Sequence, residues 1–208
     1  MAKPNIVSRD MLLEAARICI ADRGPERTTL RAVAEQAGVT QGTVFYHFRT
    51  KEQLMMEVLR GWCESSWAEM QTESAVRDLA DALAAARSRC GFDSPYHRLF
   101  FAMVAHSLHQ PAMQTPLRQL LAQENEQLAK LLESRIAQPS STEEESGKAA
   151  ERPKARQGAL SPGRLAPILN ALIDGIALQA LLDPEYPVDQ AYRDAEVWIR
   201  AMLGKDVP

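Results

Sequence analysis

Apolar residues in the first 30 positions recur at intervals of three and four, the spacing that puts them on one face of a helix. Ser8 precedes this run and can cap the helix, and Gly24-Pro25 follows the run and ends it. The residues predicted to face inward are Leu12, Ala15, Ala16, Cys19 and Ile20. The pattern predicts a first amphipathic helix after a short polar arm.

Residues 28–51 have the pattern of two short helices joined by a tight turn, followed by the start of another helix. Either Thr28 or Thr29 can cap the first of the two helices. Gly38 ends that helix because glycine readily adopts positive φ, and Thr40 caps the second. The residues predicted to face inward there are Val44 and Phe48. The remaining aromatic, small and hydrogen-bonding side chains face outward, which favours a helix-turn-helix that reads a DNA groove.

The segment AEQAGVTQGTVFYHFRTKEQL, residues 34–54, resembles the DNA-binding signature of TetR-type transcriptional regulators. Turn, cap, aromatic pair, histidine, phenylalanine and lysine stand at the family's spacings, although Phe45 replaces a frequent tyrosine and its hydroxyl. The resemblance covers about residues 9–60, and beyond it is only architectural. It implies an all-α fold: an N-terminal three-helix helix-turn-helix DNA-binding domain, residues 1–60, and a C-terminal helical ligand-binding and dimerisation domain, residues 61–208.

The candidates for DNA contact lie in the helix-turn-helix. They are Thr28, Thr29, Arg31, Thr40, Gln41, Gly42, Thr43, Phe45, Tyr46, His47 and Lys51. Gln41 and Thr43 are predicted to touch base edges, because glutamine can bond adenine twice and the threonine methyl suits thymine. The resemblance implies that Tyr46, His47 and Lys51 hold phosphates. The alternatives are that Gln41 is merely solvated and that the Tyr46 and His47 rings pack against neighbouring helices.

Helical spacing continues through the rest of the chain. It predicts helices near residues 73–89, 96–108, 117–137, 165–182 and 188–202. Ser94-Pro95 is expected to begin the second of these, and Pro111 to end it before Thr115-Pro116 caps the third. Residues 138–161 lack an apolar face and are expected to form a flexible loop. A DNA-contacting tail is the alternative there, but its acidic run opposes it.

The last two predicted helices have more apolar surface than one core can cover. The first of them has two stripes, one with Leu165, Ile168, Leu169, Leu172 and Ile176 and one with Ile173, Ala177 and Ala180. The stripe of the last helix holds Val188, Ala191, Tyr192, Ala195, Trp198 and Met202. Surplus apolar faces are what a two-fold dimer interface needs. We therefore expect a homodimer through the last two helices, which the resemblance implies pair as a four-helix bundle.

An effector pocket is expected inside the second domain, where the family binds small molecules. Candidate wall residues are Trp62, Trp67, Phe92, Tyr96, His97, Phe100, Phe101, Met103, Val104 and Met113. Asn170 and Asp174, at i and i+4 on an apolar helix, could anchor a ligand or fix the dimer register. The alternative is that the aromatic stripe is plain core. His106 and His109 have metal-ligand spacing, but no further ligand lies near them in sequence, so no metal or cofactor is predicted.

Charge is divided unevenly. Residues 1–60 contain nine Lys and Arg against seven Asp and Glu, whereas the rest contains 15 against 20, for a net charge of −3 overall. A mildly basic head on an acidic body is typical of DNA binding at one end. The three cysteines form no CxxC pair and are interpreted as reduced packing thiols in a cytoplasmic protein, with a redox switch as the alternative. Polar interruptions in residues 165–182 argue against a membrane span.

No catalytic constellation occurs: the sequence has no Gly-rich phosphate loop, HExxH or GxSxG motif. We therefore expect a regulator and not an enzyme. It would bind a double-stranded palindromic operator as a dimer and be released by an unknown small-molecule effector; repression is implied by the resemblance alone. The rival is a DNA-bound dimer regulated by a protein partner without a small-molecule effector. An enzyme would require an acid/base pair in the cavity.

Overall fold

The structure is a computed structural model that describes residues 7–71, 79–133 and 160–202. Every regular element in these ranges is a helix, which confirms the predicted all-α class. The chain divides into two compact units. The N-terminal unit comprises residues 1–66 and 93–121, and the C-terminal unit comprises residues 67–92 and 122–208. Two helices, α4 (Lys51–Gln71) and α7 (Pro111–Leu131), contribute residues to both units. The boundary expected at residue 60 therefore stays a prediction.

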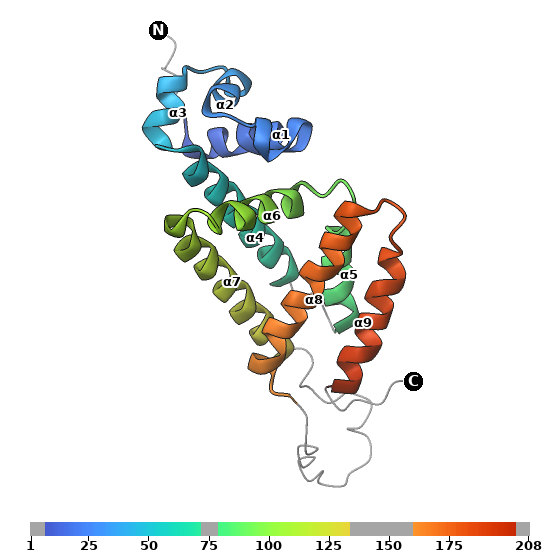
Figure 1. Ribbon diagram of the computed structural model, residues 1–208. Helices are drawn as coiled ribbons and strands as arrows, with labels where there is room; N and C mark the ends of the chain where they lie inside the picture. Colours follow the sequence, from blue (N-terminus) through green and yellow to red (C-terminus); the bar gives the residue numbers. More distant parts are fainter. Residues whose placement is uncertain (1–6, 72–78, 134–159, 203–208) are drawn as a thin grey trace. The chain divides into compact units, whose positions relative to one another are not determined.

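In the N-terminal unit, α1 (Arg9–Arg27) packs against α2 (Leu30–Ala37) and α6 (Pro95–Ser107) (Figure 1). The Ser8 hydroxyl accepts a hydrogen bond from the Met11 amide at 3.2 Å, as a capping residue should. Gly24 has φ 77° and ψ 165°, so the regular helix is interrupted where the sequence predicts. All five residues predicted to face inward on α1 are buried.

The turn between α2 and α3 (Gln41–His47) has the predicted geometry. Thr29, and not Thr28, caps α2: its hydroxyl accepts from the Ala32 amide at 3.1 Å. Gly38 ends α2 in the left-handed conformation with φ 67°. The Thr40 hydroxyl accepts from the Thr43 amide at 3.2 Å and so starts α3. The two inward residues predicted for this helix, Val44 and Phe48, are both fully buried.

The helix α4 begins after a capping residue, and the start predicted for α6 at Ser94-Pro95 is confirmed. Thr50 accepts from the Gln53 amide at 3.1 Å to begin α4, and Ser94 accepts from the His97 amide at 3.3 Å to begin α6. The prediction that Thr115-Pro116 caps α7 is wrong, because α7 already begins at Pro111 and Pro116 lies inside it. Proline fits the first turn of a helix, where its missing N–H has no partner to lose. The second proline fixes a helical φ and removes one hydrogen bond without ending the helix.

In the C-terminal unit, α9 (Val188–Met202) lies beside both α5 (Leu79–Ser88) and α8 (Pro162–Leu182) (Figure 1). The sequence places the last two helices almost at these bounds. The core of this group includes Leu83, Ala86, Leu165, Leu169, Ile176, Ala177, Ala180, Tyr192 and Ile199. The start of the helix predicted near residue 73, the end of the one predicted to reach residue 137, and nearly all of the predicted loop 138–161 lie outside the described residues.

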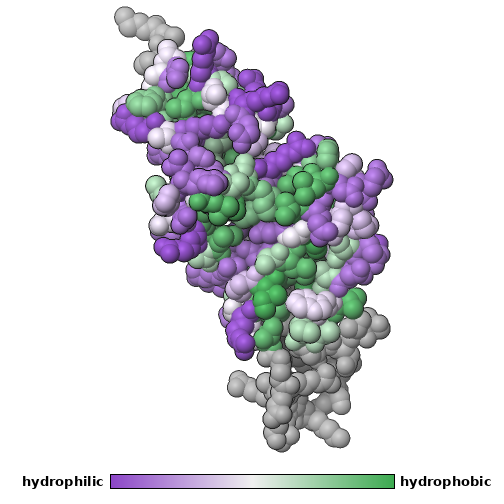
Figure 2. Space-filling view, in the orientation of Figure 1, coloured by the Kyte–Doolittle hydropathy of each residue, from purple (hydrophilic) through white to green (hydrophobic). Residues whose placement is uncertain are grey.

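The helix α8 is unusually apolar for its length. Among the described residues it is the one helix long and apolar enough to cross a membrane, with a mean hydropathy of 1.7 and 33% of that window buried. A core helix of a soluble protein has the same length and composition, so this observation alone does not indicate a span. Figure 2 shows hydrophobic residues along this helix, and Ile168, Leu178 and Leu182 are among its exposed side chains.

Candidate functional site

The outward face of α3 carries the residues expected to read DNA. Gln41 and Gly42 are exposed, Phe45 is 48% exposed, and Tyr46 is 73% exposed. Thr43 is half-buried, and its hydroxyl lies 3.0 Å from that of Thr40. Large aromatic side chains that project from a short helix gain nothing from the core. This face is therefore available to a groove, as the predicted DNA contact requires.

Arg9, which was not among the residues predicted from the sequence, holds the end of α3 in place. The guanidinium of Arg9 on α1 lies 4.6 Å from the centre of the Phe48 ring, and its Nη1 donates to the His47 carbonyl at 3.2 Å. Its Nε donates to Glu57 Oε2 on α4 at 2.8 Å. The hydrogen bond that Arg9 donates to Glu57 raises the pKa of Arg9 above its ordinary value. Arg9 thus ties α1, α3 and α4 together next to the exposed face.

Two predicted DNA-contact residues donate hydrogen bonds to backbone carbonyls near the end of α1. Thr28 is fully buried, and its hydroxyl donates to the Gly24 carbonyl at 2.8 Å, so we leave it out of the proposed contacts. Lys51 Nζ donates to the Glu26 carbonyl at 3.0 Å. The exposed Arg31 forms an ion pair with Glu35 one turn later, at 2.9 Å. A lysine has three N–H donors and an arginine has five. Lys51 and Arg31 therefore both keep further donors for a phosphate after making these bonds.

Arg49 is a further cation beside α3, and it is not among the residues predicted to contact DNA. Its guanidinium lies 5.5 Å from the centre of the Phe45 ring, and the side chain is exposed. The spacing of an aromatic residue and an arginine four positions apart is the signal that could have indicated this contact.

Most of the aromatic residues predicted to line an effector pocket form a packed cluster in the N-terminal unit. The Tyr96 ring meets Trp62 edge-on at 6.4 Å and stacks on Phe100 at 6.3 Å between centroids. His97 is buried, and its Nδ1 lies 2.9 Å from the Ser94 hydroxyl. Phe100 and Met103 are buried, whereas Phe101, Val104 and Met113 are half-buried. This packing has the character of a core, the alternative left open by the sequence.

The remaining predicted ligand residues belong to the C-terminal unit. Asn170 Nδ2 donates to Asn125 Oδ1 at 3.2 Å, which joins α8 to α7. Burial, aided by the negative charge of Glu124, raises the pKa of Asp174 to about 7. Trp67, near the end of α4, is half-buried. Asn170 is therefore partnered within the unit, and Asp174 is a carboxyl group that readily takes up a proton there.

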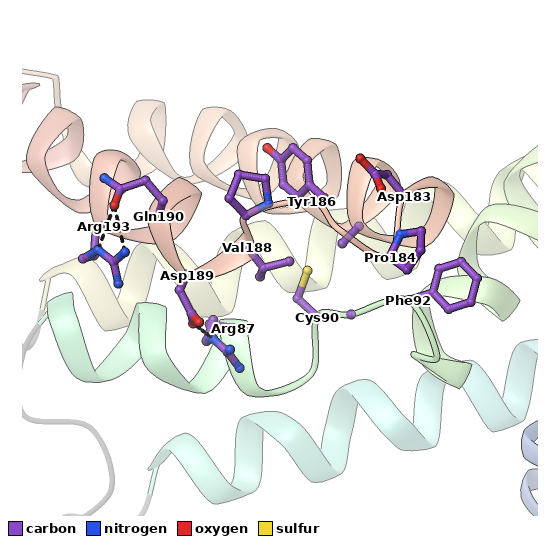
Figure 3. A pocket seen from close by; sticks show the side chains of 13 residues that line it. Arg87, Cys90, Phe92, Asp183, Pro184, Tyr186, Val188, Asp189, Gln190 and Arg193 are labelled. Atoms are coloured by element: carbon purple, nitrogen blue, oxygen red, sulfur yellow. Dashed lines mark hydrogen bonds and ion pairs between the residues drawn. The ribbon is translucent and has the colours of Figure 1, made fainter.

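A cavity of about 430 Å³ lies in the C-terminal unit, between the end of α5 and the α8–α9 turn (Figure 3). It is lined by Arg87, Cys90, Gly91, Phe92, Ala180, Asp183, Pro184, Tyr186, Pro187, Val188, Asp189, Gln190 and Arg193. Of the residues predicted to bind an effector, only Phe92 lines it. The signal that could have indicated this place is the pair of turn sequences, GFDSP and DPEYP, that flank helices in contact.

The buried thiols have the packing role that the sequence predicts. All three cysteines are buried thiols outside any disulfide, and the Cys63 thiol lies 3.4 Å from the Tyr96 hydroxyl. Burial raises the pKa values of the Cys19 and Cys90 thiols, so both favour the protonated, less reactive form. Burial also raises the pKa of Tyr192, whose hydroxyl lies near the Cys90 thiol without a hydrogen bond of good geometry.

Comparison with known proteins places these features in a family. Residues 12–58 match the model of bacterial regulatory proteins of the tetR family, and residues 75–204 match that of the BetI-type transcriptional repressor C-terminal region. The transcriptional repressor KstR2 of Mycolicibacterium smegmatis is 45% identical over 56 residues, which are 27% of this chain and 27% of that protein. This match and the next, to KstR2 of Mycobacterium tuberculosis, span at most about a third of those proteins' length.

Solved structures extend the similarity over the whole chain. A transcriptional regulator from Rhodococcus sp. Rha1 is 25% identical, with a TM-score of 0.68 over 97% of this chain and 100% of that one. A regulator from Saccharomonospora viridis in complex with choline is 21% identical, with a TM-score of 0.64 over 92% and 95% of the two chains. The latter similarity concerns the fold alone. The helix-turn-helix, the helical body and the two family matches together show that this chain belongs to the TetR family of bacterial transcriptional regulators, as its sequence signature predicted.

Proposed function

We propose that this protein is a cytoplasmic transcriptional repressor that binds a palindromic operator as a homodimer and is released by a small molecule. The observation that carries the DNA-binding part is the exposed face of α3, with Gln41, Phe45 and Tyr46 projecting from it. Gln41 and Thr43 would touch base edges. The residues that would bind phosphates and so position the helix on the DNA are Tyr46, His47, Lys51, Arg31 and the N-cap residues Thr29 and Thr40.

The dimer part rests on the free side of α8. Its exposed residues Arg164, Ile168, Ala171, Gly175, Leu178 and Leu182 follow alternating steps of four and three. That spacing makes a straight seam along a helix, of the kind that packs against another helix. Val197, Trp198 and Met202 on α9 add exposed apolar surface. A second copy that covers both helices would bury this surface and form a four-helix bundle.

Release by a small molecule is proposed from the family and from the residues near α6. The related fold from Saccharomonospora viridis holds choline, so a body of this architecture can accommodate a small ligand. Half-buried Phe101, Val104 and Met113 could line a site that opens for an effector. Such a ligand would act by binding more tightly to a dimer whose two heads no longer fit successive major grooves.

The packed cluster around Phe100 favours a second candidate, a DNA-bound dimer that responds to a protein partner. Stacked rings and a buried histidine leave that cluster filled by its own side chains. A thermal-shift screen of small molecules, followed by operator release, distinguishes the two candidates. The first requires a compound that both stabilises the protein and releases it from the operator.

The operator itself is found by selecting bound fragments from random DNA with the purified full-length protein. We expect enrichment of an inverted repeat whose half-sites lie about one helical turn, ~34 Å, or a multiple of it apart. Sedimentation of the bound complex should give an even number of protein chains. Enrichment of no sequence, or of a single asymmetric half-site bound by one chain, would contradict the proposal.

A further inference from the structure

The cavity of the C-terminal unit is built where three helix ends meet. The last turn of α5 and the following Gly91 form one wall, the end of α8 forms another, and the turn 183–187 with the start of α9 forms a third (Figure 3). Its volume of about 430 Å³ is within the range of small-molecule sites, roughly 300–1,000 Å³. All of its walls belong to one compact unit.

One part of the cavity is apolar. Ala180 and Cys90 are buried beneath it, and Val188 is half-buried beside them. The Phe92 ring is 43% exposed at one end, next to Pro184 in Figure 3. An exposed phenylalanine beside these apolar side chains offers apolar surface that a hydrophobic ligand can cover.

Two arginines and two aspartates line the cavity, and they differ in the partners that they have. Arg87 forms an ion pair with Asp189, which lowers the pKa of that carboxyl. The Asp183 carboxylate is held by the turn, because its Oδ1 accepts from the Glu185 amide at 2.9 Å. The carboxylates of Asp189 and Asp183 therefore already have hydrogen-bond partners within the protein.

Arg193 is different. Its Nε and Nη2 both donate to Gln190 Oε1, at 3.2 and 2.8 Å, and that oxygen belongs to a neutral amide. In the described part of the chain, Arg193 has no ion pair with a carboxylate, although its charge adds to that of Arg87 in lowering the pKa of Asp189. Its guanidinium is thus an exposed cation at the opposite end of the cavity from Phe92 (Figure 3). A planar guanidinium binds a carboxylate with two parallel hydrogen bonds, more strongly than it binds an amide.

We propose that this cavity is a binding site for a small amphipathic carboxylate, with its carboxylate on Arg193 and its hydrocarbon part along Val188 toward Phe92. The site is separate from α3 and from the residues of α6, so the proposal concerns a further ligand of this regulator. It can fail while the operator is found, and it can hold if no operator is found.

The test uses the full-length protein and 3-phenylpropionate as the probe, with 3-phenylpropionamide as the uncharged analogue of the same shape. Isothermal titration should give saturable binding of the carboxylate, with the amide roughly tenfold to a hundredfold weaker, the loss expected when a charge-assisted pair becomes neutral. Arg193→Gln should reduce carboxylate affinity to the level of the amide. Arg89→Gln removes a neighbouring arginine that does not line the cavity and should leave affinity unchanged.

Gln190→Glu provides a second test that hardly alters shape. It places a carboxylate against Arg193, so the new side chain should compete with the ligand and abolish its binding. Circular dichroism of each variant verifies the fold. Equal affinity for acid and amide, equal losses in Arg193→Gln and Arg89→Gln, undiminished binding in Gln190→Glu, or no saturable binding of 3-phenylpropionate would each overturn the proposal.

Discussion

The guanidinium of Arg9 lies 4.6 Å from the centre of the Phe48 ring, so the start of α1 holds the residue that ends α3. The same guanidinium donates to the His47 carbonyl and pairs with Glu57. The orientation of α3 therefore depends on a cation 38 residues earlier in the chain. Any change that loosens this contact should weaken DNA binding without touching the side chains that we propose face the groove.

Arg9→Ala should lower the free energy of unfolding by about 1–2 kcal/mol, because it removes a cation–π contact and an exposed ion pair, each worth roughly 0.5–1 kcal/mol. Operator affinity should fall as well, since α3 becomes less well fixed. Urea denaturation and fluorescence anisotropy measure the two effects. Arg9→Lys keeps the charge but not the planar guanidinium, so its stability and operator affinity should lie between those of the unchanged protein and of Arg9→Ala. A stable variant with undiminished operator affinity would show that Arg9 does not position α3.

Gln41→Ala should relax sequence preference. Losing a good base contact costs ~1–3 kcal/mol of discrimination between operator and random DNA. Lys51→Ala should weaken binding to both DNAs alike and reduce the slope of log affinity against log salt by ~1, as expected for one lost phosphate contact. Anisotropy titrations over a salt series distinguish the two roles. Identical behaviour of the two variants would contradict this division.

The structure adds a second expectation for Lys51. Its Nζ donates to the Glu26 carbonyl, next to the interruption of α1 at Gly24. The variant should therefore also lose a little stability, about 1 kcal/mol for one hydrogen bond to a charged donor near the surface. The salt slope isolates the phosphate contact, because lost stability alone does not change it.

The helix-turn-helix was predictable residue by residue because local chemistry determines it. The Ser8 and Thr40 caps, the positive φ of Gly38 and the burial of Val44 and Phe48 all follow from patterns within about ten residues. The Ser94 cap of α6, outside the helix-turn-helix, follows from the same kind of local pattern. The bounds of α8 and α9 were also nearly correct, since their apolar periodicity is long. Whether Thr28 or Thr29 capped α2 could not be decided, because both hydroxyls stand at suitable positions.

Contacts between residues distant in sequence could not be predicted in this way. Arg9 reaches Phe48 and Arg87 reaches Asp189 only because the helices are brought together by the tertiary fold. The cavity has the same origin, since its walls come from segments about 90 residues apart and depend on where two turns meet. An aromatic stripe such as that of α6 is compatible with core or pocket, and only the observed stacking favours core there.

Phe100 and Phe101 should respond differently to truncation. Phe100 is 4% exposed and stacks on Tyr96, so Phe100→Ala should cost ~3–5 kcal/mol as a core cavity does. Phe101 is half-buried against His97, and Phe101→Ala should cost clearly less. Urea denaturation of both variants measures the difference. We further expect Phe101→Ala to bind operator but to respond poorly to an effector, and a normal response would place the effector site elsewhere.

Leu178→Glu should convert the proposed dimer into monomers. Leu178 is 42% exposed in the middle of the α8 seam, and a buried carboxylate without a partner is strongly unfavourable. Sedimentation equilibrium measures the change, and operator affinity should fall with it. Leu108→Glu is the matched control, because Leu108 is 70% exposed at the end of α6 and outside the seam. A dimer of undiminished stability in Leu178→Glu would rule out α8 as the interface.

Asp174→Asn should stabilise the protein in a pH-dependent way. Burial raises the pKa of Asp174 to about 7, and the charge of Glu124 on α7 adds to this effect. The unfolded chain loses the same proton near the ordinary value of 3.8, so between these two pH values the native state binds more protons than the unfolded state. Stability due to this group is therefore complete below pH ~4 and falls as the pH rises toward ~7.

The total fall in the free energy of unfolding due to Asp174 is at most about 4 kcal/mol, since each unit of pKa shift corresponds to ~1.4 kcal/mol. Asparagine has nearly the same shape and does not titrate, so the variant lacks this fall. Urea denaturation at pH 5 and pH 8, at equal protein concentration, should find the variant's advantage larger at pH 8. Asp22→Asn, a change at an exposed aspartate of α1, serves as the control and should be neutral at both pH values. An advantage of Asp174→Asn that is constant with pH would mean that the carboxyl is charged in the folded protein throughout this range.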